Sequence, residues 1–349
     1  MLTGPLLGVL LHAIGGFAAG SFYAPLRKVD RWAWESFWLV MGIAAWLIAP
    51  WAVAWITTPD LIPVLQSAPL SVIAWCVCYG MFWGVGNLTF GLSVRYLGMA
   101  LGYAAALGFC MLFGTLMPPI FEGQFGEILR SRSGAVILLG ITFCLIGIGI
   151  CGWAGMRKEA ECSDLESEET VSEFSISKGF LLAAVAGILS ACFAFGLSAG
   201  KPIAELSIEA GTEPLYSNNA VLVVILVGGL TSNLLWCLAL NRRNGTFGDY
   251  AGKGGQPLFR NYALSSMAGL VWYGQFFFYG MGTTKLGEQY EFSSWSIHMA
   301  FIIVFSNLWG IVFDEWRGTS RKTKATVWVG LLTLIGSTIV IGYGNYLSD

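Results

Sequence analysis

Long apolar runs separated by short polar segments dominate this chain. A helix that crosses the hydrocarbon core of a bilayer needs about 20 predominantly apolar residues. Ten runs are of about that length, which predicts an all-α membrane protein with ten transmembrane helices. The runs cover residues 4–25, 33–56, 70–93, 97–120, 134–154, 179–200, 215–240, 261–282, 290–313 and 325–346.

The composition agrees with a membrane protein and argues against several other classes. Hydrophobic residues make up 56% of the 349 residues and charged residues 11%, whereas a soluble domain carries about 25% charged residues. The net charge of −2 gives a nucleic-acid partner no electrostatic support. The eight cysteines fall mostly inside apolar runs and lack the spacing of a zinc site, so we expect no metal. The first run has no basic flank and no small-residue cleavage site, so we expect no cleavable signal peptide.

One strongly polar segment, residues 156–178, divides the chain. It carries seven acidic residues with serines and threonines between them, which is too polar for a packed element. We therefore expect an acidic cytoplasmic linker between a first five-helix repeat, residues 1–155, and a second, residues 179–349. A regulatory role for this linker stays open beside that of a plain connection.

Short matches recur between the two predicted halves at an offset of 189 residues. Trp83 recurs as Trp272, and Leu97-Gly98 recurs as Leu286-Gly287. The biased composition also produces matches of this kind by chance. Two five-helix repeats must have opposite orientations in the membrane, which is the inverted-repeat arrangement of secondary transporters. Such transporters bind their substrate near the bilayer midplane between the repeats.

The basic residues predict how the helices are oriented. The loops after the first, third, fifth, seventh and ninth runs hold 15 of the 19 Lys and Arg residues. The positive-inside rule then places these loops in the cytoplasm and both termini outside.

Two ionisable residues share one face of the ninth predicted helix. Glu291 and His298 are seven residues apart, which is two helical turns and about 10 Å along the axis. Ionisable groups at membrane depth are costly and usually face a cavity or a partner. Because a proton-coupled carrier needs such groups on an inward face, both residues are candidates for proton coupling. Glu35, in the first turn of the second predicted helix, is a third candidate.

Amides and aromatic residues inside the predicted helices form a second group of candidates. Sugar sites combine polar groups that bind hydroxyls with aromatic faces that cover the apolar side of the ring. No glycine motif for nucleotide phosphates is present, so we expect coupling to an ion gradient. The candidates for substrate binding are His12, Tyr23, Trp38, Asn87, Lys201, Trp272, Gln275, Tyr279, Gln289 and Trp295.

Each candidate also fits a structural role. Tryptophan and tyrosine form belts at membrane interfaces. Carboxylates near helix starts, such as Glu35 and Glu291, complement the helix dipole. His12 fits a hydrogen-bonded structural histidine equally well, and Lys201 fits a side chain that extends to the interface.

Several segments, in order along nearly the whole chain, are similar to one known family. They read HAIG (12–15), FYAP (22–25), WAWE (32–35), WGVGN (83–87), RYLGM (95–99), WYGQFFFY (272–279), QYE (289–291) and WSIHM (295–299). These segments resemble the bacterial L-rhamnose–proton symporters of the drug/metabolite transporter superfamily. The resemblance implies ten helices in two repeats and proton-driven uptake of L-rhamnose, or a closely related deoxy sugar, across a bacterial inner membrane. The proton is then the coupling ion, and no cofactor is expected.

Two other hypotheses concern different activities. An exporter of hydrophobic cations or other metabolites should pair a deep carboxylate with an aromatic cage, but Glu291 lies near a helix start. A membrane enzyme that acts on lipid-linked sugars should carry paired catalytic carboxylates or a metal-ligand cluster. The nearest acidic pair, Asp314 and Glu315, is adjacent in sequence and points to different helix faces. We therefore expect a transporter and not an enzyme.

Overall fold

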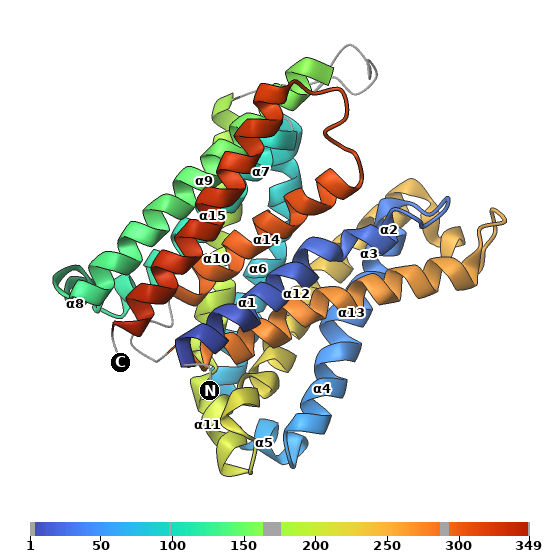
Figure 1. Cartoon of the computed structure of the whole chain (residues 1–349). Helices are drawn as coiled ribbons and strands as arrows, with labels where there is room; N and C mark the ends of the chain where they lie inside the picture. The colour runs from blue at the N-terminus through green and yellow to red at the C-terminus, as the bar shows by residue number, and fades with distance from the viewer. Residues whose placement is uncertain (1–3, 98, 163–175, 287–292, 348–349) are drawn as a thin grey trace. The chain divides into compact units, whose positions relative to one another are not determined.

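Helices account for the secondary structure of the computed structural model, which describes residues 4–97, 99–162, 176–286 and 293–347 (Figure 1). No strand occurs within these ranges, so the predicted all-α fold is confirmed. The α-helices are α1 (Gly4–Ser21), α2 (Tyr23–Leu26), α3 (Trp34–Ile43), α4 (Ala49–Thr57), α5 (Leu61–Ser67), α6 (Leu70–Leu97), α7 (Met99–Phe121), α8 (Phe125–Arg130), α9 (Arg132–Cys162), α10 (Ile176–Ala199), α11 (Lys201–Glu209), α12 (Asn218–Asn244), α13 (Leu258–Thr283), α14 (Ser293–Val312) and α15 (Arg321–Tyr346). A π-helix, η1 (Ala44–Ile48), joins α3 to α4, and 3₁₀ turns η2 (Pro214–Tyr216) and η3 (Thr246–Ala251) flank α12.

Nine stretches of helix in the described ranges are long and apolar enough to cross a membrane. They coincide with nine of the ten predicted runs, from Gly4–Leu26 to Arg321–Tyr346. The remaining run corresponds to α13, which is 26 residues long. Its polar and aromatic side chains, among them Asn261, Trp272 and Gln275, lower its mean hydropathy. The tenth span therefore stays a prediction.

The segment predicted as a linker, 156–178, is helical at both ends. α9 continues to Cys162 and α10 begins at Ile176, while 163–175 lies outside the described residues. The carboxylate of Glu161 accepts hydrogen bonds from the backbone N–H of Ser320 at 2.6 Å and from the hydroxyls of Ser320 and Thr323 at 2.8 and 2.7 Å. These bonds tie the end of α9 to the start of α15. Glu161 therefore belongs to a helix and has partners on a second helix. The predicted boundaries of the two repeats are not tested by this observation.

The described chain divides into two compact units. Unit 1 comprises residues 1–17, 86–194 and 282–349, and unit 2 comprises 18–85 and 195–281. The boundaries fall inside four helices, α1, α6, α10 and α13, so each of these helices contributes to both units. Each unit also takes segments from both predicted repeats.

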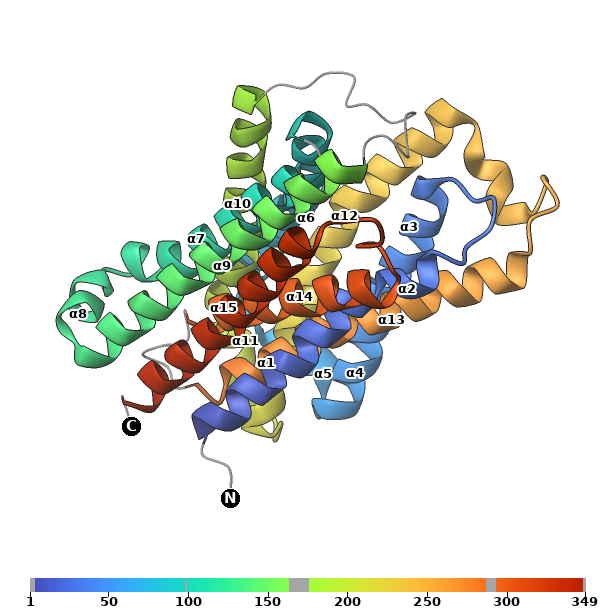
Figure 2. The same cartoon turned by 45° about the horizontal axis from the view of Figure 1, so that its top comes forward.

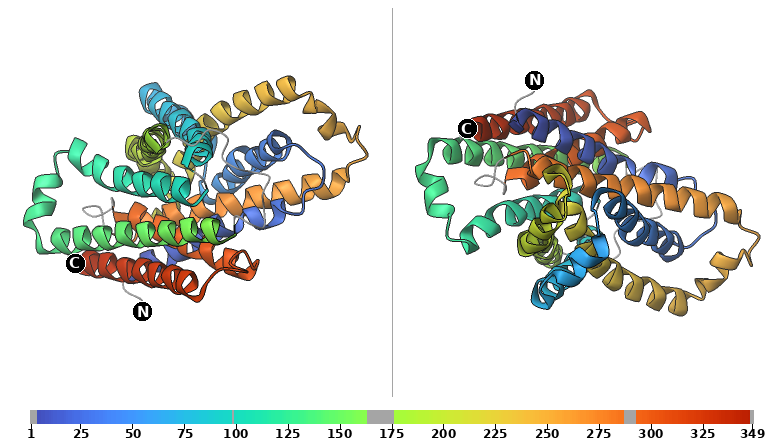
Figure 3. Two further views of the ribbon diagram at one scale, coloured as in Figure 1. Left: turned by 90° about the horizontal axis from the view of Figure 1, so that it is seen from above. Right: turned by 90° about the horizontal axis from the view of Figure 1, so that it is seen from below.

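In unit 1, α9 and α15 lie side by side and antiparallel, as three different views agree (Figures 1, 2 and 3). Glycines allow this close contact. A Cβ added to Gly140 would lie 2.5 Å from Ile341, and one added to Gly344 would lie 2.6 Å from Ile137. The hydroxyl of Ser133 donates a hydrogen bond to the carbonyl of Gly344. Small residues are what lets helices approach closely in lipid, where tails are as apolar as the side chains.

In unit 2, α12 is the central helix. Residues 219–226 are all buried, which is typical of a helix surrounded by other helices. Its Gly228 lies against the backbone of Val77 on α6, where a Cβ would collide with the carbonyl oxygen. At one end of α12, Asn219 donates to Thr57 at 2.9 Å, and at the other end Asn244 donates to Glu35 at 2.9 Å. The segment from α3 to α4 therefore runs antiparallel to α12.

Within each unit, loops predicted to lie on one side of the membrane contact each other. In unit 2, the Arg31 guanidinium donates to the carbonyl of Gly255 at 2.7 Å, and Arg260 donates to that of Lys28 at 2.9 Å. In unit 1, Lys158 forms an ion pair with Glu315 at 4.0 Å, besides the Glu161 bonds described above. These contacts agree with the grouping of basic loops, although which side faces the cytoplasm stays a prediction.

We predict that Gly344→Ala destabilises the protein, because the new methyl group must displace Ile137 or the backbone beside it. Overpacking of this kind costs about 1–3 kcal/mol. Thermal unfolding of detergent-purified protein measures the effect. Gly336→Ala, on the same helix, is the control because its Cβ would meet nothing within 4 Å. Equal unfolding temperatures for the two variants would contradict the packing described here.

Candidate functional site

His12 and His298, the two histidines of the chain, are in contact inside unit 1. His12 lies on α1 and His298 on α14, and their ring centroids are 5.8 Å apart with an interplanar angle of 66°. Both side chains are buried, with 0% and 3% of their surface exposed. Imidazole is the side chain that ordinarily changes charge near neutral pH. The contact between the two rings makes the pair a candidate for proton transfer.

A glycine on a third helix makes room for this pair. A Cβ added to Gly282 of α13 would lie 2.8 Å from Nε2 of His12, closer than carbon atoms approach such groups. Gly16 lies one turn beyond His12 on α1 and packs in the same way against Phe301 of α14. The two glycines allow α1 to approach both α13 and α14, and this approach brings the two imidazoles together.

Trp295 lies on α14, as His298 does. Trp295 contacts α7 and α10, whereas His298 contacts α1. Its indole N–H donates to the carbonyl of Cys110 on α7 at 3.0 Å, and its ring lies over Gly114. The Phe193 ring of α10 is 6.0 Å away. The ring is thus clamped among helices of unit 1, and its predicted role in stacking on a sugar stays a prediction.

Two predicted candidates on the same part of the chain, Gln289 and Glu291, lie outside the described residues. The predicted shared face of Glu291 and His298 is therefore not tested.

Unit 1 also contains buried polar atoms with no hydrogen-bond partner among the described residues. These are Nδ2 of Asn87, on α6, and Oγ of Ser294, on α14. Buried polar groups in native proteins nearly always bind a protein group or a water molecule. Both atoms are therefore available to a water or to a ligand hydroxyl. Ser294 was not among the predicted binding residues, although it lies one turn before His298.

Aromatic rings form a continuous cluster in unit 2. Trp272 of α13 lies at its centre, with ring centroids 4.3 Å from Phe22, 5.2 Å from Trp38 and 5.4 Å from Trp46. Trp83 of α6 extends the cluster at 5.9 Å from Trp46. The structure thus brings together two predicted candidates, Trp38 and Trp272, from different helices.

Trp38 is held in place by an amide on α12. Its indole N–H donates to Oδ1 of Asn233 at 3.2 Å, and Asn233 in turn donates to the carbonyl of Gly229 at 2.9 Å. Asn233 was not predicted as a functional residue, because nothing in its own helix indicated that it faces α3.

The π-helix η1 places Trp46 in this cluster. The backbone N–H of Ala49 donates to the carbonyl of Ala44, five residues earlier. Pro50 follows directly and has no N–H to donate to Trp46, which removes an α-helical bond. π-bulges are frequent at functional sites. The indole N–H of Trp46 is buried and has no partner among the described residues, and Pro50 was the sequence signal for this feature.

The other candidates on α13 are buried in unit 2. Gln275 is 8% exposed and Tyr279 is 4% exposed. Tyr273, not predicted, has a buried hydroxyl without a partner in the described chain. Such side chains are the hydrogen-bonding groups expected at a site for a hydroxylated ligand.

Tyr23 and Lys201 lie at more open positions of unit 2. Tyr23, at the start of α2, is 47% exposed, and Lys201, at the start of α11, is exposed. The Tyr23 ring borders the aromatic cluster, with its centroid 5.9 Å from that of Phe22. The predicted binding roles of Tyr23 and Lys201 are not tested.

Glu35 belongs to a hydrogen-bond network at the end of unit 2 that carries the basic loops. Its Oε1 accepts from Nδ2 of Asn244 at 2.9 Å and from the hydroxyl of Thr246 at 2.8 Å. Thr246 also donates to Asn241 at 2.9 Å, and Ser36 donates to Oδ2 of Asp249 at 2.7 Å. The network ties the start of α3 to the end of α12, and the predicted proton-coupling role of Glu35 stays a prediction.

Comparison with known proteins identifies the family. The sequence model described as "L-rhamnose-proton symport protein" matches residues 1–346. The chain belongs to this family. The L-rhamnose-proton symporter of Yersinia pestis (strain Pestoides F) is 36% identical over 343 residues, which cover 97% of this chain and 98% of the relative. That of Shigella flexneri is 37% identical over 342 residues, which cover 97% of each chain. The resemblance inferred from short segments is thus confirmed over nearly the whole length.

We predict that Glu35→Ala destabilises this symporter-family chain more than Glu35→Gln does. The alanine leaves Asn244 and Thr246 without their acceptor at a cost of about 1–3 kcal/mol, whereas the amide oxygen of glutamine can still accept. Thermal unfolding in detergent measures the difference. Glu205→Ala, at an exposed position of α11, is the control. An unchanged unfolding temperature for Glu35→Ala would show that the network contributes nothing.

Proposed function

We propose that this chain is a secondary active transporter that takes up L-rhamnose, or a closely related deoxy sugar, together with a proton. The match of the family description to residues 1–346 carries the proposal, since that description names both the sugar and the coupling ion. The two alternative hypotheses, an exporter of other metabolites and a membrane enzyme, have no comparable support.

The proposed location is the bacterial inner membrane, which the chain crosses several times. The apolar helices support insertion in a bilayer. The distribution of Lys and Arg favours a cytoplasmic position for the loops that contain Arg31, Arg157 and Arg317, with both termini outside.

The proposed architecture is ten transmembrane helices in two inverted five-helix repeats. α9 begins at Arg132 and α15 at Arg321, 189 residues later, which is the offset of the sequence matches. Equivalent helices of an inverted repeat have opposite directions. α9 and α15 are antiparallel in unit 1, and α3 and α12 are antiparallel in unit 2, as this arrangement requires.

The proton candidates from the sequence are Glu291, His298 and Glu35. We add His12, which the sequence placed among the substrate-binding candidates, because its ring contacts that of His298. Adjacent imidazoles can exchange a proton directly or through a water, and each neutral ring has one donor and one acceptor nitrogen. Burial of both rings in unit 1 limits access by bulk water.

The sugar candidates of unit 2 are Trp38, Trp272, Gln275 and Tyr279. Their combination of large rings and an amide suits a deoxy sugar, whose methyl group adds apolar surface to one side of the ring. Asn87 is the corresponding candidate of unit 1, because its amide N–H has no partner among the described residues. Tyr23, Lys201, Gln289 and Trp295 stay candidates on the basis of the sequence.

Alternating access would use the four helices that belong to both units. Glycines lie within two residues of every unit boundary, at Gly16, Gly86, Gly196 and Gly282 among others. On α13, Gly280 packs against Asn218 in unit 2 and Gly282 against His12 in unit 1. Glycine inside a helix destabilises it by roughly 0.5–1 kcal/mol relative to alanine, which makes local bending easier. We propose that these glycines let each helix bend as the protein alternates.

Uptake of radiolabelled L-rhamnose by proteoliposomes tests the proposed function. An imposed pH gradient, acidic outside, should drive accumulation above the external concentration, and a protonophore should abolish it. Equal uptake with and without the gradient would reject proton coupling. No uptake of L-rhamnose in either condition, with uptake of another sugar, would reject the substrate.

We predict that His298→Gln separates sugar transport from proton coupling. Glutamine keeps a hydrogen-bonding side chain but cannot take a proton, so the internal sugar concentration should no longer exceed the external one. Exchange of labelled for unlabelled L-rhamnose across the membrane, which needs no net proton movement, should persist. Accumulation equal to the wild type would exclude His298 as a proton carrier, and the same assay on Glu291→Gln tests the carboxylate.

We predict that Asn87→Ala weakens sugar binding without weakening the fold. A hydrogen bond to a ligand is worth about 0.5–1.5 kcal/mol, so the half-saturating L-rhamnose concentration should rise several-fold. Asn219→Ala is the matched control, because it removes the bond to Thr57, which is not a sugar candidate, and should lower the unfolding temperature. An unchanged half-saturating concentration for Asn87→Ala would remove Asn87 from the site.

A further inference from the structure

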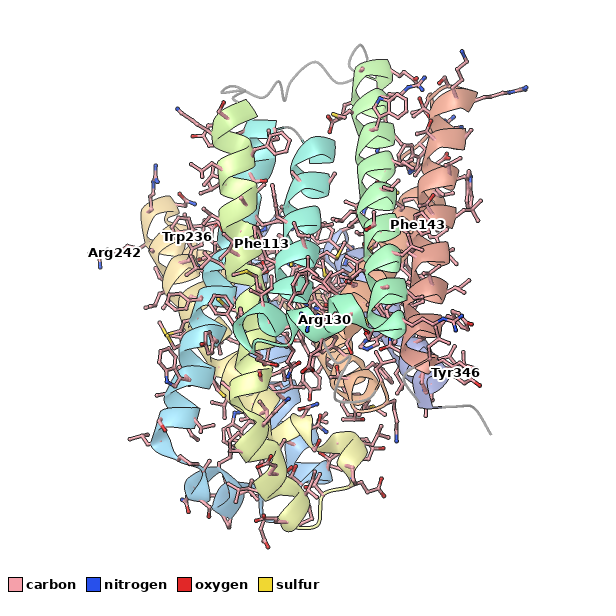
Figure 4. All side chains as sticks on the ribbon, turned by 90° about the vertical axis from the view of Figure 1, so that its left-hand side faces the viewer. Phe113, Arg130, Phe143, Trp236, Arg242 and Tyr346 are labelled. Carbon is pink, nitrogen blue, oxygen red and sulfur yellow. The ribbon has the colours of Figure 1, made fainter. Side chains whose placement is uncertain are left out.

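A groove of about 300 Å³ lies on unit 1 between α7, α9 and the start of α10. Figure 4 shows these three helices together on one side of the molecule. The walls of the groove include Ala105, Phe109, Ile148 and Phe180, and its lining carries no charged side chain, amide or hydroxyl. A sugar would find almost no hydrogen-bond partner there, so this groove does not belong to the sugar site.

Glycine makes the groove hollow. Gly149 lines it, and a Cβ added at this position would meet nothing within 4 Å. Gly108 lies on the opposite wall, and the nearest atom to its Cβ would be in Ile148 at 3.8 Å. The chain therefore leaves open space where ordinary helix packing would fill it.

Two basic side chains, Arg157 and Lys178, lie near one end of the groove, in the segment 156–178 that also carries acidic residues. Arg157 follows the lining residue Met156 on α9, and its guanidinium lies 5.8 Å from the ring of Trp153, which also lines the groove. Lys178 lies two residues before Phe180 on α10, with its ammonium 5.9 Å from the ring of Tyr96. Arg157 also lies 3.7 Å from Glu161, an i,i+4 pair. Glu161 is at the same time bound by Ser320 and Thr323 on α15.

We propose that the groove binds one acyl chain of an anionic phospholipid, with the phosphate at Arg157 and Lys178. The apolar walls suit a hydrocarbon chain, and basic pockets between helices on the cytoplasmic side recognise anionic headgroups. The site is thus complementary to a lipid at both ends.

Native mass spectrometry of the detergent-purified protein, titrated with phosphatidylglycerol or phosphatidylcholine, tests this proposal. The wild type should retain phosphatidylglycerol in preference. Gly149→Leu fills the groove and should reduce binding of both lipids. Arg157→Gln with Lys178→Gln should lower affinity for phosphatidylglycerol alone, by roughly fivefold for each charge removed near the membrane surface.

Two controls accompany these variants. Gly336→Leu adds the same side chain at an open position on α15. Arg130→Gln removes a basic residue at the end of α8, away from the ends of α9 and α10 that flank the groove (Figure 4). Both should bind lipid as the wild type does.

Three results would overturn the proposal. The first is equal retention of the two lipids by the wild type. The second is unchanged binding in the double charge variant, which leaves the apolar lining of the groove intact and so decides the question even if Gly149→Leu fails to fold. The third is a dimer that dissociates in Gly149→Leu, which would assign the groove to a second copy.

Discussion

Close approach of helix backbones at glycine is the constraint on which the rest of this structure depends. Lipid provides no hydrophobic drive for helices to associate, so contact must come from shape and from polar bonds. Gly228 against Val77 forms the core of unit 2, and Gly344 against Ile137 joins α9 to α15 in unit 1. The same constraint shapes the chemistry, because His12 occupies the space that a side chain at position 282 would fill.

The polar chemistry follows from this packing and divides between the units. Unit 1 holds the imidazole pair, and unit 2 holds the aromatic cluster around Trp272. α1 contributes to both, since it carries His12 toward one unit and leads to Phe22 in the other. α13 does the same through Gly282 and Trp272. Both helices carry glycines next to the unit boundaries.

The sequence predicted much of the fold because membrane helices leave a strong local signal. Nine of the ten runs correspond to apolar helices, and the eighth lacks that signal only because α13 is rich in aromatic and polar residues. His12 and His298 were predicted as separate candidates, but their contact was not, because periodicity identifies a face and not the helix that it meets. Trp295 illustrates the same limit, since its neighbours on α7 are far away in sequence. Glu161 was expected in a solvated linker. It is exposed and lies in the last turn of α9, and its bonds to Ser320 and Thr323 join residues far apart in sequence, which no local pattern reveals.

We propose that the two histidines carry the coupling proton, and the composition of the chain offers a direct test. Because the chain has only two histidines, ¹⁵N-histidine labelling reports on this pair alone. Solid-state NMR of the labelled protein in lipid measures the protonation of each ring nitrogen. The account predicts that addition of L-rhamnose changes these signals. Identical imidazole spectra with and without L-rhamnose, across about pH 5–8 where histidine normally titrates, would contradict it.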